Sequence, residues 1–181
     1  MLEILGFTTM ESTIWNTGAY ASLIAIMFGI TYERFRKQIF VIAPFILMLY
    51  SGFFLEDRLL AVSQLLITVS GLLGMFSVNY RTRTLVMLCL VPIASTVLLA
   101  MGVLNSMVAT VGFFGLLGIV FGVLLIPKPK AFLLLVAGTV LLLFYSFSVS
   151  AWVFFVLNIF LLFANTAGYV KASQQEASVS G

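Results

Sequence analysis

Seven apolar runs, each about 17–21 residues long, divide the chain between charged residues, prolines and short polar clusters. A helix of about 20 residues rises about 30 Å, which matches the hydrocarbon core of a bilayer. The runs occupy residues 14–32, 38–55, 59–79, 84–104, 106–126, 131–147 and 150–170. The pattern predicts an all-α, polytopic membrane protein with seven transmembrane helices. Six helices are the alternative if a loop as tight as that around Asn105 is a kink in a longer helix.

The composition favours the same class of protein. Apolar residues make up 62% of the chain and charged residues 8%, and the mean hydropathy is +1.21. These values lie far outside the range of soluble domains. One small core could not hide so much apolar surface, so we expect most of it to face a lipid bilayer. The segment before the first run, residues 1–13, carries two acids and no Lys or Arg, and therefore predicts no cleaved signal peptide.

The basic residues predict the orientation, because Lys and Arg resist translocation across a membrane. Eight of the nine fall on one side of the predicted membrane: Arg34, Arg36, Lys37, Arg81, Arg83, Lys128, Lys130 and Lys171. Only Arg58 falls on the other side. We therefore expect residues 1–13 to be extracytoplasmic and residues 171–181 to form a cytoplasmic tail, disordered because it is small and polar. Topology and anionic lipid account for the net charge of +3, so no nucleic-acid partner is expected.

The third and seventh runs resemble each other. SQLLITVSGLLGMF, residues 63–76, aligns with LNIFLLFANTAGYV, residues 157–170, which places Gln64 on Asn158. Upstream, LYSG at 49–52 meets FYSF at 144–147 one residue out of register, and FGITYERFRKQ at 28–38 meets FGVLLIPKPK at 121–130. Four crossings separate the two copies, so they have the same orientation. The sequence therefore predicts two parallel three-helix repeats, 14–79 and 106–170, joined by a linker helix at 84–104.

This 3+1+3 plan, together with the chain length and the basic inner loops, resembles the SWEET-like superfamily. PFILMLYSGFFLEDRLLAVSQLLITVSGLLGMF (44–76) and FYSFSVSAWVFFVLNIFLLFANTAGYV (144–170) are similar to the PnuC vitamin-transporter family. The total length and FGITYERFRKQ, followed by RTRTLVM (81–87), resemble YgjV-type inner-membrane proteins. The resemblance implies facilitated diffusion of a small solute, nucleoside- or vitamin-like, across a bacterial inner membrane. A homo-oligomer is compatible with it.

The residue types needed for enzymatic or ion-coupled chemistry are scarce. The chain has no histidine, its single Cys89 has no partner for a metal site or disulfide, and every carboxylate lies at or beyond the end of a run. No phosphate-binding loop or nucleophile–base pair occurs. We therefore expect no enzyme, no metal and no cofactor. Because no ionisable side chain lies well inside a run, an uncoupled facilitator is expected rather than a pump.

The polar residues inside the runs are uncharged, and six of them form the predicted solute-binding set: Gln64, Asn158, Tyr50, Tyr145, Thr68 and Asn165. Spacings of four and seven residues place Gln64 with Thr68, and Asn158 with Asn165, on single helix faces. Gln64 and Asn158 are expected to face each other across the two repeats near the membrane midplane. The alternative is that the amides bond across helices as structural glue, which applies most to Asn165.

A second function fits the same sequence. The chain could be a non-transporting membrane interaction protein, such as a subunit, scaffold or immunity-type component. Its amides would then pair with the helices of a partner. Polar faces that converge inside the protein favour transport, whereas polar faces on the lipid-exposed perimeter favour the partner.

The predicted orientation can be tested with single cysteines. After Cys89 is replaced, a cysteine at Ser12 should react with an impermeant thiol reagent applied from outside, and a cysteine at Ser173 should not. The reverse labelling pattern would contradict the orientation.

Overall fold

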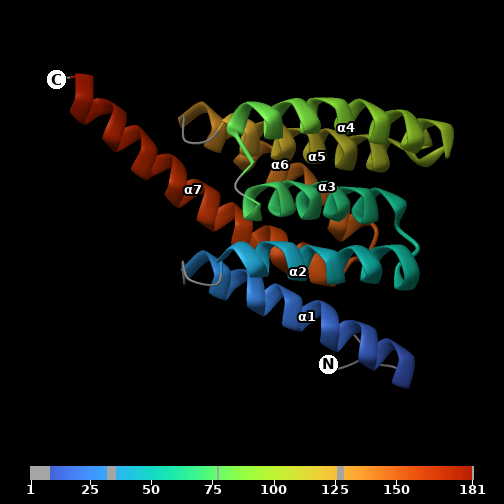
Figure 1. Ribbon diagram of the computed structural model, residues 1–181. Helices are drawn as coiled ribbons and strands as arrows, with labels where there is room; N and C mark the ends of the chain where they lie inside the picture. Colours follow the sequence, from blue (N-terminus) through green and yellow to red (C-terminus); the bar gives the residue numbers. More distant parts are fainter. Residues whose placement is uncertain (1–8, 32–35, 77, 126–128, 181) are drawn as a thin grey trace. The chain divides into compact units, whose positions relative to one another are not determined.

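The computed structural model is helical throughout the residues that it describes, which are 9–31, 36–76, 78–125 and 129–180 (Figure 1). The α-helices are α1 (Met10–Thr31), α2 (Arg36–Leu49), α3 (Arg58–Met75), α4 (Tyr80–Ala100), α5 (Met107–Leu125), α6 (Pro129–Ser148) and α7 (Trp152–Ser180). Two short elements complete the order: a π-helical turn, η2 (Tyr50–Phe54), and a 3₁₀ turn, η3 (Val103–Asn105).

These helices confirm the all-α class and the number of helical segments expected from the apolar runs. When η2 is counted with α2, the predicted boundaries lie within four residues of the observed ones, apart from the end of α7. At Asn105, α4 and α5 are separate helices, because the chain breaks at Gly102, whose φ is 67°, and at the 3₁₀ turn. The expected basic residues Arg34 and Lys128, and most of the N-terminal segment, lie outside the described residues.

The C-terminal tail differs from the expectation. Helix α7 continues to Ser180, whereas the sequence predicts disorder beyond Lys171. The tail contains Ala, Gln and Glu, which have high helix propensity, and it extends a helix that has already been nucleated by its apolar part.

Local hydrogen bonds explain where several helices begin. At the start of α1, the Ser12 backbone N–H donates to Thr9 Oγ1 at 3.1 Å and the Thr9 N–H donates to Ser12 Oγ at 2.8 Å, a reciprocal cap. Asp57 Oδ1 accepts from the Leu60 N–H at 2.9 Å at the start of α3. Asn79 Oδ1 accepts from the Arg81 N–H at 3.3 Å at the start of α4. These side chains satisfy N–H groups that the first helical turn leaves unpaired.

The chain divides into two compact units, Met1–Val103 (unit 1) and Leu104–Gly181 (unit 2). In unit 1, α2 packs against both α1 and α3, and α4 packs against α3 (Figure 1). Leu47, Leu59 and Leu60 are almost fully buried in this unit. The predicted linker helix, α4, therefore belongs to the same unit as α1–α3.

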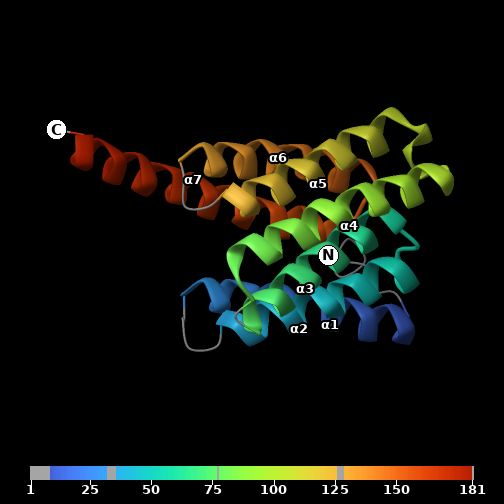
Figure 2. The same ribbon diagram turned by 45° about the horizontal axis from the view of Figure 1, so that its top comes forward.

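In unit 2, α6 packs against both α5 and α7, and α7 runs alongside α6 in both views (Figure 2). Helices α5 and α6 approach closely at glycines: a Cβ at Gly118 would lie only 2.8 Å from the Gly138 Cα. The Phe132 ring of α6 lies directly against Gly168 of α7. Small residues at such contacts let helix backbones come together. In each unit, the middle helix of the predicted three-helix repeat contacts both of its neighbours.

Three helices in the described part of the chain are long and apolar enough to cross a membrane: Arg81–Ala100, Lys130–Ser148 and Trp152–Gln174. Three further apolar helical stretches are shorter: Val41–Phe54, Arg58–Leu73 and Met107–Gly122. Large apolar side chains are exposed on several helices, among them Phe53 at 73% and Phe163 at 70%.

The turns that follow η2 and α6 are built in the same way. Glu56 and Ser150, which the alignment places together at an offset of 94, both adopt a positive φ, 54° and 57°. Positive φ is uncommon for residues other than glycine. Backbone bonds close the first turn from Leu55 N to Tyr50 O and the second from Val149 N to Tyr145 O.

The π-helical turn explains the shift of register between the two copies. The bond to Tyr50 O spans five residues, whereas the bond to Tyr145 O spans four, so unit 1 holds one extra residue. A π-helical turn has exactly this i→i+5 bonding and accommodates a single added residue within a helix. The one-residue mismatch between LYSG and FYSF is therefore absorbed in η2.

Single-residue deletions can test this account. Deleting Phe53, a 73% exposed residue in η2, should shorten the π turn to the length seen in unit 2 and shift the apparent Tm by only a few degrees. The matched control is deletion of Phe144, which is 52% exposed in regular helix. It should rotate the preceding part of α6 by about 100° and lower the Tm by about 10 °C or more. Equal losses from both deletions, measured by thermal unfolding, would contradict the account.

Candidate functional site

The buried polar side chains are all uncharged in the part of the chain that the structure describes. In unit 1 they are Ser12, Asn16, Ser22, Ser51, Ser63, Gln64 and Thr68. In unit 2 they are Thr139, Ser146 and Asn158. Most of them lie on the helix pairs α2–α3 and α6–α7, which are the paired elements of the predicted repeat. A buried polar group is costly without a hydrogen-bond partner, so the partner of each one indicates its role.

Two amide–hydroxyl hydrogen bonds join α6 to α7. Asn165 Nδ2 donates to Thr139 Oγ1 at 3.2 Å, and Asn158 Nδ2 donates to Ser146 Oγ at 3.3 Å. Each hydroxyl in turn donates to its own helix, Thr139 to Leu135 O and Ser146 to Leu142 O, both at 2.6 Å. We call these four side chains the amide ladder.

The ladder has a regular spacing. Its two hydroxyls are seven residues apart on α6 and its two amides are seven residues apart on α7, so successive rungs lie two turns apart between antiparallel helices. Asn158 Nδ2 also donates to Phe154 O at 2.8 Å, one turn earlier in α7. Both asparagines therefore have a structural role that the glue interpretation anticipated. Their contact with a solute stays a prediction.

Unit 1 has a different polar link, between α1 and η2. Tyr50 Oη donates to Asn16 Oδ1 at 2.7 Å, and both residues are buried. The Tyr50 ring stacks on Phe54 at a centroid distance of 5.4 Å, and Trp15 stacks on Phe54 at 6.4 Å. Tyr50 and Phe54 are four residues apart in the π turn, so η2 presents both rings toward α1. The result is an aromatic stack beside a buried hydrogen bond.

Helix α3 supplies the remaining polar residues of unit 1. Gln64 and Thr68 are each 5% exposed, and Thr68 Oγ1 donates to the Gln64 backbone carbonyl at 2.8 Å. Ser63 Oγ donates to Leu60 O at 2.7 Å. Across from α3, Ser51 Oγ lies 2.8 Å from Leu47 O and 3.0 Å from Met48 O. Each of these hydroxyls donates to a backbone carbonyl of its own helix, as Ser and Thr hydroxyls commonly do in apolar surroundings.

The structure brings some predicted site residues together and adds others. Tyr50 and Tyr145, both buried, occupy matched positions at the turns, and Gln64 and Thr68 share one face of α3. The described geometry is that of each unit by itself, so the facing of Gln64 and Asn158 stays a prediction. The residues Asn16, Thr139 and Ser146 also form these hydrogen bonds and were not among the site residues predicted from the sequence. The spacing of seven between Thr139 and Ser146, equal to that between the two asparagines, is the signal that could have identified them.

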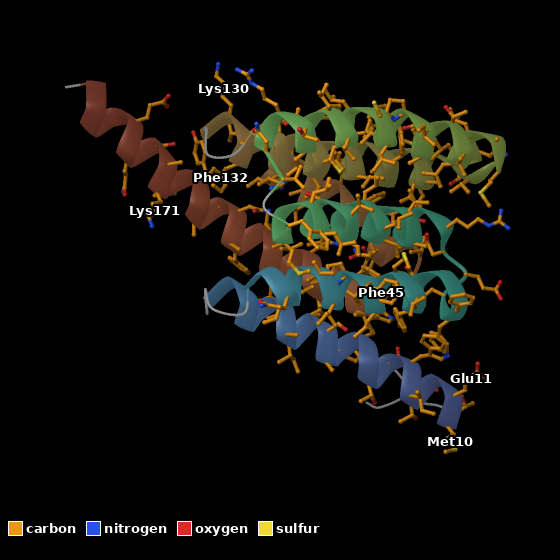
Figure 3. The ribbon with its side chains drawn as sticks, in the orientation of Figure 1. Met10, Glu11, Phe45, Lys130, Phe132 and Lys171 are labelled. Atoms are coloured by element: carbon orange, nitrogen blue, oxygen red, sulfur yellow. The ribbon has the colours of Figure 1, made fainter. Side chains whose placement is uncertain are left out.

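Most acidic and basic residues of unit 1 lie at opposite ends of that unit. Glu11 lies at the start of α1 (Figure 3), at the end of unit 1 where Glu56 and Asp57 form the turn after η2. Arg81 and Arg83 lie at the α3–α4 turn, and Arg83 Nη2 donates to Ser70 Oγ at 3.1 Å. In unit 2, Lys130 near the start of α6 and Lys171 in α7 lie toward the same end (Figure 3). Arg81, Arg83, Lys130 and Lys171 thus lie away from the positive-φ turns, whereas Arg58 directly follows the first of them.

The chemistry open to this arrangement is hydrogen bonding and ring stacking. Among the described residues, no group of three His, Cys, Asp or Glu could hold a metal ion. No protein-family model, curated protein or solved structure matches the chain.

A double-mutant cycle can measure the ladder. Asn165→Leu, Thr139→Val and the double variant should show a coupling of about 0.6–1.7 kcal/mol in the free energy of unfolding, the range found for buried bonds between membrane helices. The control is Thr166→Val, because the exposed Thr166 hydroxyl donates only to its own helix, at Leu162 O. Combined with Thr139→Val, it should be additive within about 0.5 kcal/mol. Additivity of Asn165→Leu and Thr139→Val would contradict the ladder.

Proposed function

We propose that the chain is an integral membrane protein that lets a small, neutral, polar solute, nucleoside- or vitamin-like, diffuse across a bacterial inner membrane. The solute binds near the midplane, against uncharged polar side chains of the repeated helix pairs. Residues 1–13 lie outside and the C-terminus lies in the cytoplasm.

One observation carries the proposal: buried polar residues occupy equivalent places in two copies of the same helix pair. Ser51 and Gln64 in α2–α3 correspond to Ser146 and Asn158 in α6–α7, and all four are at most 5% exposed. The shared positive-φ turn supports the repeat independently of side-chain identity. Parallel repeats related by an axis along the membrane normal are a recurrent transporter plan, with the solute near the midplane.

The absence of charge among these residues favours facilitated diffusion. Carriers driven by protons or ions commonly keep Asp, Glu, His or Arg inside the bilayer, where these residues titrate or pair. The buried polar side chains of the described residues are Ser, Thr, Asn and Gln. Such groups can replace water around a neutral solute, but they do not exchange protons at physiological pH.

The interaction-protein alternative predicts polar faces on the perimeter of the molecule. The amides that hydrogen-bond between α6 and α7 instead face the inside of their unit. Gln64 is likewise buried. The burial of these amides supports transport over helix-to-helix recognition of a partner.

Uptake into proteoliposomes tests the proposal. A panel of labelled nucleosides, vitamins and sugars should contain a solute that enters several-fold faster than into protein-free vesicles and stops at equal inside and outside concentrations. A proton uncoupler should leave the uptake unchanged, because no titratable group drives it. The proposal fails if no member of the panel enters faster than into protein-free vesicles. Accumulation that collapses with the uncoupler would contradict the uncoupled mechanism.

A further inference from the structure

The two units differ at one matched pair of residues. In unit 2, Asn158 donates to Ser146. In unit 1, the counterpart Ser51 is bonded to its own helix at Leu47 and Met48. Among the described residues, no group hydrogen-bonds the side-chain amide of Gln64, although Gln64 is only 5% exposed. Of the two matched side-chain amides, that of Asn158 is therefore hydrogen-bonded and that of Gln64 is not.

The π turn accounts for this difference. In unit 2, a regular helical turn carries Ser146 to the level of Asn158. In unit 1, Ser51 lies within η2 itself, where the added residue changes the local turn that sets the position of the Ser51 side chain relative to α3. Ser51 then bonds its own backbone, and the rung to Gln64 is not formed. Single-turn π bulges occur frequently at functional sites.

Gln64 lies at the level of the aromatic stack. A Cβ on Gly52 of η2 would lie 3.6 Å from the Ala61 Cβ, which fixes the alignment of the antiparallel α2–α3 pair. Gln64 is about one turn further along α3 and so lies level with the start of η2, where Tyr50 stacks on Phe54. The Gln64 amide, which no other described residue hydrogen-bonds, thus lies at the same depth as the rings of the aromatic stack.

We propose that Gln64 is the residue of unit 1 that recognises the solute, and that it takes a neutral, flat ring bearing N–H and C=O side by side. This inference rests on the proposed function. A primary amide presents one acceptor and two donors, so it can form two hydrogen bonds with such a cis-amide edge. Burial without charged neighbours among the described polar residues selects a neutral solute. The aromatic stack at the same depth of unit 1 favours a planar one.

The unbonded amide also predicts an unusual effect on stability. Replacing a polar group that makes no hydrogen bond within the protein breaks no such bond, so the change in stability is small. Gln64→Leu and Gln64→Met should therefore keep or slightly raise the apparent Tm in the absence of solute. The control is Thr166→Val, because the exposed Thr166 hydroxyl bonds only its own helix at Leu162 O; it should change the Tm little and leave the affinity for solute within about threefold of the original.

The experiment compares uridine with two related compounds. N3-methyluridine lacks the N–H of the uracil base, and ribose lacks the base altogether. Binding to the purified full chain is measured by equilibrium dialysis, and the Tm by thermal unfolding. The inference expects uridine to bind at least tenfold more tightly than N3-methyluridine, and Gln64→Leu to weaken uridine binding at least tenfold, which is about 1.4 kcal/mol.

Four outcomes would overturn the inference. If Gln64→Leu binds uridine as tightly as the original protein, Gln64 does not recognise the solute, although the proposed function still stands. If the protein binds ribose but not uridine, the solute is not a ring with a cis-amide edge, although the proposed function still stands. A large fall in Tm for both Gln64→Leu and Gln64→Met assigns the amide a structural role. Failure of all three probes to bind, together with no uptake of any solute in the proteoliposome panel, rejects the inference and the proposed function alike.

Discussion

Hydrogen bonding of polar groups in apolar surroundings is the constraint on which this structure depends. The backbone meets it by forming helices throughout the described residues, and the hydroxyls meet it by bonding to carbonyls one turn earlier. Amides cannot satisfy both their donors and their acceptor on their own helix. Asn158 and Asn165 therefore reach across to α6, and the amide ladder fixes the register of α6 against α7. Gln64 is the exception, and we attribute the exception to function.

The similar turns of the two helix pairs, and the single added residue in unit 1, connect the fold to the candidate site. Both units contain a helix pair closed by a turn with a positive-φ residue at the same aligned position. The π turn of unit 1 adds one residue and separates the serine from the amide that its counterpart bonds in unit 2. A change of backbone in one turn thus accompanies the loss of a hydrogen bond between the serine and the amide, while the surrounding helices keep the same order.

Much of the fold could be predicted from the sequence, because apolar runs bounded by charges determine where helices begin and end. The tail beyond Lys171 was more difficult, since a polar composition does not distinguish a disordered segment from the extension of an established helix. The amide positions Gln64, Asn158 and Asn165 were identified from periodicity and alignment. Their partners were not, because a hydrogen bond across an antiparallel pair depends on the register of two helices, and neither helix determines that register alone.

Hydrogen–deuterium exchange of the side-chain amides, followed by NMR on the full chain in lipid nanodiscs, tests the central claim most directly. Loss of a signal in Gln64→Leu, Asn158→Leu or Asn165→Leu assigns each amide. The account predicts that the Asn158 and Asn165 amides, held in the ladder, exchange slowly. The Gln64 amide, open to solute and water, should exchange much faster. Protection of Gln64 equal to that of Asn158 would contradict the account, because it would show that the Gln64 amide is bonded within the protein.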